Sequence, residues 1–510
     1  MEVKRKKLLN IFIYTTIIAL FAHGYRFLNN LYTSDALVEV FQDDIYYQRS
    51  LGRFMQPLIM VTRGVICSPW LIGCVSIALL TLSVYLISEL LEIENGLLLF
   101  FLSGVLTCNV TVTSACAAFM PWVDVYALAL LLAMLGVWLY FKDKWWGYFC
   151  GSVLMICSMG LYQAYIDTAL ALITILLIGK LLNGEEAKGF FIRTGKIVGS
   201  LIGTAVGYWC VFKLILKIHH VAEATSYNGL SYVGQYEGVS IIGLIADTYQ
   251  KALSYLLSPK TFVSTILLDI RISDAWVILL RLCFLVCAGL AIAFIVLLNI
   301  KKKTPLWNRI LQALALVLFP LMCNAVNIIS KGMEHDLMVY AVFFFYVLVI
   351  YVISRAHGEG GFSNAKLVLV MIPIAFIVWN GVVHSNQVYF KVDMQDRAAL
   401  SYATRVVASI ENTEGSEPGV TPVVFIGWPE PGRNFSEVLY LRDVHCYGAD
   451  TKTPFSYGGS LPSYLRNFLA VPMNITEEDI PDSLVKEMNE YPGDNSIAFY
   501  NDILVVKFSE

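Results

Sequence analysis

The chain has 510 residues, of which 57% are hydrophobic and only 15% are charged, and its mean hydropathy is +0.65. Soluble domains carry about 45–50% apolar and about 25% charged residues, so this composition excludes an ordinary soluble enzyme, a disordered chain and a collagen-like chain. The net charge of −3 gives no indication of a nucleic-acid partner. The composition is typical of a polytopic membrane protein embedded in a lipid bilayer.

Apolar runs long enough to cross a bilayer recur through the first three quarters of the chain. A spanning helix needs roughly 20 such residues, and about eleven runs approach or reach this length. We therefore predict an all-α polytopic membrane protein, whose first span is a retained helix because no small-x-small cleavage site follows it. The predicted spans are residues 8–28, 69–91, 97–116, 122–141, 147–161, 163–182, 197–217, 275–300, 309–328, 337–354 and 367–384.

Basic residues gather at alternate ends of these spans, which predicts the orientation of the protein. The short loops 113–121 and 329–336 are nearly free of them. We predict a cytoplasmic N-terminus and an extracytoplasmic C-terminus, with the outer loops 29–64 and 218–275 on the extracytoplasmic side. The residues that mark the cytoplasmic side are Lys4, Arg5, Lys6, Lys7, Lys142, Lys144, Lys180, Lys188, Arg193, Lys196, Lys301, Lys302, Lys303, Arg309, Arg355 and Lys366.

A shift in charge divides the chain into two regions. Residues 385–510 hold 9 basic and 18 acidic groups, a net charge of −9, whereas residues 1–384 carry a net charge of +6. Such a shift is typical of a boundary between a membrane region and a soluble domain. We predict a transmembrane region over 1–384 and an extracytoplasmic tail domain over 385–510.

The tail has the pattern of a small α/β domain. Residues 390–411 carry apolar side chains at helical spacing, and 423–427 is typical of a buried strand. Residues 496–500 and 503–508 flank an Asn-Asp pair, which predicts a hairpin with a two-residue turn. In the outer loop 218–275, residues 239–257 predict a helix that lies in the membrane interface.

Ionisable residues collect just after the first span. Asp35, Asp43 and Asp44 lie close in sequence to Arg26 and Arg53. A carboxylate can take a proton from a sugar hydroxyl, and arginine can pair with a phosphate through two hydrogen bonds. A solvated polar loop held by ion pairs is the alternative interpretation. Ionisable groups near a bilayer are costly unless they have a function, so this segment is the first candidate for a site.

Several short stretches follow the pattern of one enzyme family. They are Phe21-Ala22-His23-Gly24-Tyr25-Arg26, Asn29-Asn30, Ser34-Asp35, Ser50-Leu51-Gly52-Arg53-Phe54, Ser68-Pro69-Trp70-Leu71, Asp124-Val125-Tyr126-Ala127-Leu128-Ala129, Gly160-Leu161-Tyr162-Gln163-Ala164-Tyr165 and Asn386-Gln387. With these stretches the chain resembles the phage-type glucosyl transferase II family, whose best-known members convert the serotype of bacterial O-antigens. The resemblance covers most of the chain and is firmest over residues 20–165.

The resemblance implies a GT-C-like glycosyltransferase of a bacterial plasma membrane. Such enzymes use a polyprenyl-phosphate sugar donor on the outer face and a carboxylate of the first outer loop. The implied donor is undecaprenyl-phosphate glucose, and the implied acceptor is a sugar of a surface polysaccharide. Asp35 is then the leading candidate for the base, although Asp43 and Asp44 also fit the paired acids of such loops. No cofactor is expected, and a divalent cation is compatible with this chemistry but not required by it.

Further residues are candidates for substrate binding, each with a structural alternative. Asp124 either lines the acceptor site or favours the dipole of a helix that starts beside it. Tyr162 and Gln163 either line the site or pack in a tight turn. Lys331, in a short loop with three other ionisable groups, either binds the donor phosphate or belongs to a solvated turn. Arg26 and Arg53 either contact a phosphate or reach toward lipid headgroups.

Two other functions remain open from the sequence. A transporter or flippase of lipid-linked sugars would show internal repeats and charges near the middle of the bilayer, whereas here the acids gather near span ends. An O-antigen ligase or polymerase would share the outer loops but transfer a whole glycan.

Overall fold

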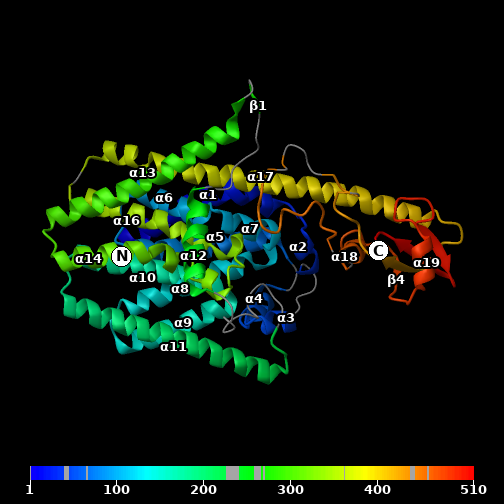
Figure 1. Ribbon diagram of the computed structural model, residues 1–510, viewed down its shortest axis with the longest axis horizontal. Coiled ribbons are helices and arrows are strands. Elements are labelled where there is room, and N and C mark those ends of the chain that lie inside the picture. Colours follow the sequence, from blue (N-terminus) through cyan, green and yellow to red (C-terminus); the bar gives the residue numbers. More distant parts are fainter. Residues whose placement is uncertain are drawn as a thin grey trace.

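The computed structural model describes residues 2–509 except 40–44, 65–66, 225–239, 258–265, 268–269, 361, 433, 437–440, 442 and 457–458. Most of the helices lie side by side in one bundle, and a smaller domain extends beyond one end of it (Figure 1). We call the end that carries this domain the tail face and the opposite end the far face.

Nine described helices are long and apolar enough to cross a membrane, and the pair α6 (Gly96–Thr107) and α7 (Val110–Ala118), bent by 47°, makes up to ten. A further apolar helix, α9 (Trp145–Leu161), has 17 residues, which is the lower limit for a span. The prediction of an all-α polytopic membrane protein is thus confirmed. The nine are α1 (Glu2–Leu28), α5 (Pro69–Leu90), α8 (Val123–Tyr140) with η1 (Met120–Trp122), α10 (Ile166–Leu182) with η2 (Gln163–Tyr165), α11 (Ala187–His219), α13 (Ile272–Lys301), α14 (Leu306–Cys323), α16 (Phe344–Gly358) with η5 (Tyr340–Phe343), and α17 (Asn364–Glu411).

Shorter elements cluster at the tail face and in the tail. The segment 29–64 forms α2 (Ser34–Glu39), α3 (Ile45–Ser50) and α4 (Gln56–Arg63), while α12 (Ile241–Leu257) corresponds to the helix predicted at 239–257 and crosses the bundle helices (Figure 1). The remaining elements are β1 (Ile266–Leu267), β2 (Ile270–Arg271), α15 (Val326–Ile329), η4 (Asp336–Met338), β3 (Pro422–Ile426), α18 (Ser460–Asn467), β4 (Asn474–Ile475), α19 (Asp482–Glu487), β5 (Ile497–Tyr500) and β6 (Ile503–Lys507).

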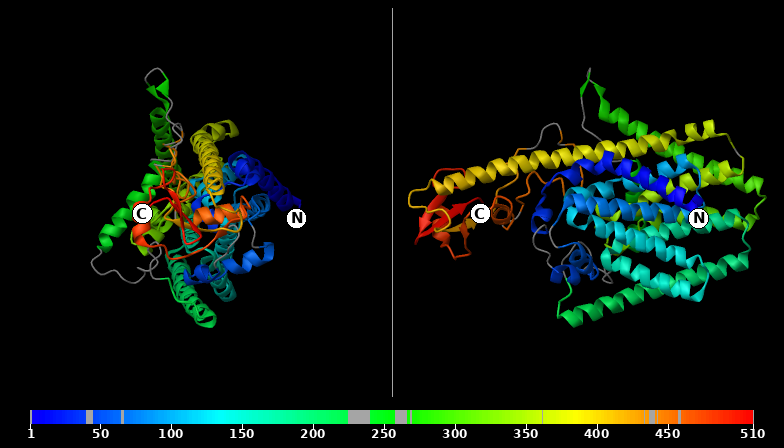
Figure 2. Two further views of the ribbon diagram at one scale, coloured as in Figure 1. Left: turned by 90° about the vertical axis from the view of Figure 1, so that its right-hand side faces the viewer. Right: turned by 180° about the vertical axis from the view of Figure 1, so that it is seen from behind.

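A single helix connects the bundle to the tail. The span predicted at 367–384 and the helix predicted at 390–411 are one continuous α17 of 48 residues, about 72 Å long at 1.5 Å per residue. It runs past the end of the bundle into the tail (Figure 2). There its buried residues Tyr402, Val406 and Ile410 pack against the sheet, together with Leu37 of α2. The tail core thus includes a residue of α2, which follows the first membrane helix.

The tail sheet contains four strands in the order β4-β3-β6-β5. The central strands β3 and β6 are parallel, and β5 and β6 form an antiparallel hairpin in which Tyr500 pairs with Ile503. Asn501 and Asp502 both adopt positive φ, +46° and +63°, as a two-residue hairpin turn requires. The hairpin predicted from the Asn-Asp pair is therefore confirmed.

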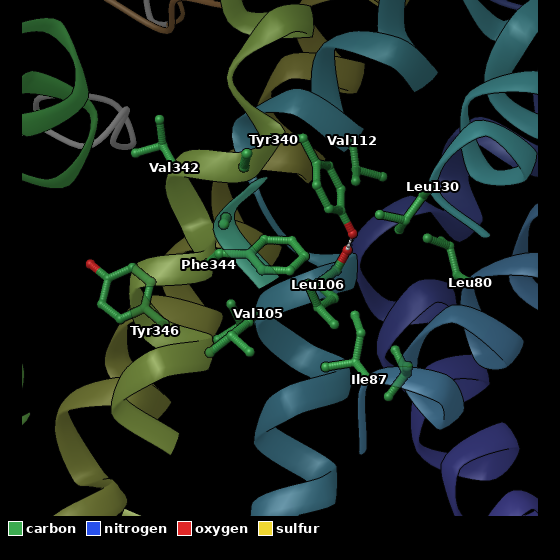
Figure 3. Packing of buried hydrophobic residues seen from close by; sticks show 14 of the residues in the cluster. Leu80, Ile87, Val105, Leu106, Val112, Leu130, Tyr340, Val342, Phe344 and Tyr346 are labelled. Carbon is green, nitrogen blue, oxygen red and sulfur yellow. Dashed lines mark hydrogen bonds between the residues drawn. The ribbon is translucent and has the colours of Figure 1, made fainter. Parts of the chain in front are cut away.

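The break between α6 and α7 leaves backbone carbonyls without helical partners in the middle of the bundle. Three side chains supply the missing donors: Asn109 Nδ2 to Val105 (3.1 Å), Tyr340 Oη to Leu106 (2.6 Å, Figure 3) and His23 to Thr107 (3.0 Å). An unsatisfied carbonyl inside a membrane costs several kcal/mol, so these bonds permit the bend. All three donors are buried, and they come from three different parts of the chain. The three accepting carbonyls belong to the consecutive residues Val105, Leu106 and Thr107.

Gly381 of α17 allows this helix to approach the break closely. A Cβ added there would meet the carbonyl oxygen of Cys108 and would lie 3.0 Å from its carbonyl carbon. Alanine normally favours a helix over glycine by about 1 kcal/mol, but backbone atoms cannot move aside as a flexible side chain can. We predict that Gly381→Ala lowers the free energy of unfolding by about 1–3 kcal/mol, measured as a lower melting temperature in detergent micelles.

The matched control is Gly289→Ala in α13, because a Cβ at Gly289 meets nothing within 4 Å. This variant should melt at the wild-type temperature or slightly above it. Equal melting temperatures for the two variants would contradict the close approach of α17 to the break.

Candidate active site at the tail face

Four pieces of chain that are far apart in sequence meet at the tail face. They are the first segment (29–64), the turn at 162–165, the loop 330–336, which we call the central loop, and residues 443–450 of the tail, which we call the docking segment. Hydrogen bonds join them in pairs: Gln163 Nε2 donates to Leu51 O (2.7 Å), and Tyr447 N donates to Asp336 Oδ2 (2.8 Å). The candidate residues lie in or next to these four pieces.

Arg26 is buried near the end of α1, where it binds backbone rather than solvent. Its guanidinium donates to the carbonyls of Cys116 (2.8 Å), Asn29 (2.7 Å) and Leu31 (3.0 Å). These bonds tie the start of the first segment to α7. The geometry supports a structural role, and the predicted phosphate contact of Arg26 stays a prediction.

Asp35 lies in the first turn of α2, with its side chain exposed. The protein packed beneath the carboxyl partly dehydrates it and raises its pKa above the usual value. Thr33, just before it, donates to Ala118 O (3.2 Å), which fixes the start of α2 against the end of α7. The other predicted acids of this segment, Asp43 and Asp44, lie outside the described residues.

Arg53 meets the turn at 162–165, as both had been predicted to belong to one site. The Arg53 guanidinium lies 5.0 Å from the centre of the Tyr162 ring, a cation–π arrangement. Gln163 Nε2 donates to Leu51 O (2.7 Å) and to Tyr208 Oη (2.9 Å), so it holds the first segment in place. Arg53 therefore packs over the Tyr162 ring at the end of the bundle.

Asp124 forms a buried ion pair that the sequence did not indicate. Its Oδ2 accepts a hydrogen bond of 2.6 Å from Arg63 Nε, and both side chains are at most 8% exposed. Arg63 also donates to Pro121 O. The pair fixes the end of α4 to the start of α8, so Asp124 lies beside the site with its carboxylate already engaged.

The central loop contains Lys331, Glu334, His335 and Asp336. Lys331 and the next residue, Gly332, both adopt positive φ, 51° and 83°, so the chain reverses sharply there. Burial and, to a smaller extent, the nearby positive charge of Arg53 lower the pKa of His335 to about 4. His335 is therefore neutral at physiological pH.

Glu334 is an acid of this loop whose pKa is clearly raised. The pKa of Glu334 is raised to about 7, and burial is the largest cause. The charges of Asp247 and Asp336 raise this pKa as well, whereas the adjacent Asn324 amide and the Lys251 ammonium lower it. Lys251 Nζ pairs with Asp247 Oδ2 (3.0 Å) and donates to Asn327 Oδ1 (3.2 Å). These contacts hold α12 against the central loop.

The docking segment of the tail covers the central loop. The Tyr447 ring stacks on His335, with ring centres 3.9 Å apart and planes 7° apart, and its other neighbour is Phe119 at 6.0 Å. Ser114 donates to Tyr447 O (3.0 Å), and Lys391 donates to Val444 O (2.7 Å). Tail residues thus form part of the wall around His335.

Sequence reasoning drew attention to the central loop through its four ionisable groups but selected only Lys331. It missed Arg63, Glu334 and Tyr447, since burial and pairing with distant segments leave no local pattern. Within the described ranges, no three His, Cys, Asp or Glu side chains converge as metal ligands. The candidate site therefore contains the Arg53 guanidinium packed over Tyr162, several carboxyl groups and the neutral His335.

A bundle of membrane-crossing helices with ionisable loops gathered at one end defines a polytopic membrane protein with a candidate site at the membrane surface. A sequence model of the family described as glucosyl transferase GtrII matches residues 24–384. The chain belongs to this family and is a glycosyltransferase, which confirms the family suggested by its sequence. No curated protein and no solved structure matches the chain.

The Arg63–Asp124 pair predicts a large cost for removing one partner. Asp124→Asn leaves the Arg63 charge buried without its counter-charge, and such a loss costs about 3–5 kcal/mol. We expect a clearly lower melting temperature in detergent micelles. The control is Asp143→Asn, which breaks the exposed Lys196–Asp143 pair of 3.1 Å and should cost less than about 1 kcal/mol. If both variants melt alike, the buried pair does not stabilise the fold.

Proposed function

We propose that the protein transfers glucose, or another hexose, from a polyprenyl-phosphate donor to a sugar of a surface polysaccharide such as an O-antigen. Membership of the glucosyl transferase GtrII family supports glucosyl transfer. The observation that carries the proposal is the position of Arg53, held over Tyr162 beside the central loop at the end of the membrane helices. A donor whose lipid stays in the bilayer would present its phosphosugar at this level.

We infer that the tail face is extracytoplasmic and that the N-terminus lies in the cytoplasm of a bacterial cell. The far face carries the ends of α8, α10, α13 and α16 and the starts of α11 and α17 (Figure 1). Basic residues at these ends, such as Lys142, Lys302 and Arg355, match the excess of positive charge on the cytoplasmic side of membrane proteins.

The reaction follows from the chemistry of such a donor. A carboxylate accepts the proton of the acceptor hydroxyl while the hydroxyl oxygen bonds to the anomeric carbon of the donor sugar. The bond from that carbon to the phosphate oxygen breaks, and its electron pair stays on the polyprenyl phosphate. Arg53 pairs with this phosphate. The leaving group is already a stable anion, so we expect no cofactor, and a divalent cation is compatible with the scheme.

Asp35 is the proposed base, because it lies in the first segment, reaches solvent and keeps a raised pKa. Arg26 and Lys331 remain candidates for phosphate contact, and Asp124, Tyr162 and Gln163 for the lining of the acceptor site. The reaction scheme does not depend on these further assignments.

We predict that Asp35→Asn lowers the transfer rate by about 100-fold or more, the usual contribution of a general base. The measurement is transfer of labelled glucose from polyprenyl-phosphate glucose to a polysaccharide acceptor by protein in proteoliposomes. The wild-type rate should fall as the pH drops through the raised pKa of Asp35, since only the carboxylate accepts a proton.

The control is Asp479→Asn, the same change at an exposed tail residue, which should keep the wild-type rate. Wild-type transfer by Asp35→Asn would remove Asp35 as the base. Label that only changes leaflet in the wild-type protein would indicate a flippase, and transfer of a whole glycan would indicate a ligase or polymerase.

A further inference from the structure

A second group of polar side chains surrounds Glu334, the residue before His335 in the central loop. Glu334 belongs to the central loop, Asn324 lies at the break between α14 and α15, and Asp167 lies in the first turn of α10. The Asn324 amide is next to the Glu334 carboxyl. Three segments that are distant in sequence therefore bring two carboxyl groups and an amide together.

Three oxygens of this group are buried and accept no hydrogen bond from the described residues. They are Asn324 Oδ1, Asp167 Oδ1 and Glu334 Oε2. The Asn324 and Asp167 side chains are fully buried. The other carboxylate oxygen of Asp167, Oδ2, accepts a hydrogen bond from Val326 N (2.9 Å). Buried acceptors without donors are unfavourable, so a fold that keeps three of them side by side fits a ligand that brings hydroxyl donors.

The charges around the group select the kind of ligand. Asp247 of α12 and Asp336 of the central loop add negative charge, and Lys251 of α12 adds a positive charge. Lys251 is already paired with Asp247 and bonded to Asn327. A phosphate would be repelled here, whereas a neutral molecule with several hydroxyl groups could donate to the three oxygens and accept from Asn324 Nδ2, which is also buried without an acceptor among the described residues.

We propose that Asp167, Asn324 and Glu334 form a subsite that binds the hydroxyl groups of a neutral sugar ring. This inference rests on the proposed function, in which Arg53 binds the donor phosphate and a sugar must lie next to it. Glu334 forms the entrance, because its side chain is partly exposed while the other two are buried. The sugar is either the glucose ring of the donor or the acceptor sugar, and the two sources are separable by experiment.

The subsite carries its own pH dependence. The ionised Glu334 accepts hydrogen bonds from hydroxyls, and the protonated acid accepts them less well. Because the pKa of Glu334 is about 7, sugar binding should strengthen as the pH rises from 6 to 8. The groups that face Glu334 from its neighbours include Asp167, Asp247, Lys251, Tyr255, Asn324 and Asp336.

The test compares Glu334→Gln with Glu478→Gln, the same change at an exposed tail residue. We expect Glu334→Gln to raise the KM for one sugar substrate at least tenfold, to change kcat far less, and to lose the pH dependence of that KM between pH 6 and 8. A raised KM for the donor assigns the subsite to the donor glucose, and a raised KM for the acceptor assigns it to the acceptor. Glu478→Gln should behave as wild type.

Equilibrium binding separates this inference from the proposed function. A short-chain glucosyl phosphoprenol and the unlinked acceptor oligosaccharide are each titrated into the wild-type protein and into Glu334→Gln, with Glu334→Asp as the variant that keeps the charge should the first fail to fold. Unchanged KM values, unchanged pH profiles and unchanged binding would overturn the subsite while transfer, and with it the proposed function, stands. Absence of transfer by the wild-type protein would overturn the proposed function, and the binding comparison would still decide the subsite.

Discussion

The hydrogen bonds that satisfy the broken α6–α7 backbone hold the rest of the structure in place. A bilayer supplies no water to the carbonyls of a bent helix, so the donors have to come from the protein. They come from α1 (His23), η5 (Tyr340) and the break itself (Asn109), while Gly381 allows α17 to lie against the same point. One bend therefore fixes the relative positions of the helices that surround it.

The arrangement of the tail face depends on the bend between α6 and α7. The bend directs α7 toward the loops, where Thr111 donates to Asp336 O (2.7 Å) and Ser114 donates to Tyr447 O. Asp336 also accepts from Tyr255 (3.1 Å), so one carboxylate joins α12, the central loop and the tail. The tail is thus part of the architecture of the site, because its docking segment is bonded to the central loop.

Charge is divided at this face in a way that suits a phosphosugar. Arg53 provides positive charge close to His335, and Asp167, Asn324 and Glu334 provide hydrogen-bond acceptors around the preceding position of the same loop. His335 stays neutral because burial and Arg53 both lower its pKa, and Tyr447 stacks on its ring. A lipid-linked sugar combines an anionic phosphate with a neutral polyol, and the two regions match these two parts under the proposed function.

The sequence by itself determined the class of protein, the order of the spans, the tail hairpin and the family, since apolar runs, a two-residue turn and short motifs are local patterns. It also named Arg53, Tyr162 and Gln163 among the candidate site residues. Only the tertiary structure decided that Arg26 binds backbone carbonyls, that Asp124 pairs with Arg63, and that burial raises the pKa of Glu334. The physical reason is that burial and pairing depend on the packing of segments up to hundreds of residues apart, which no local pattern records.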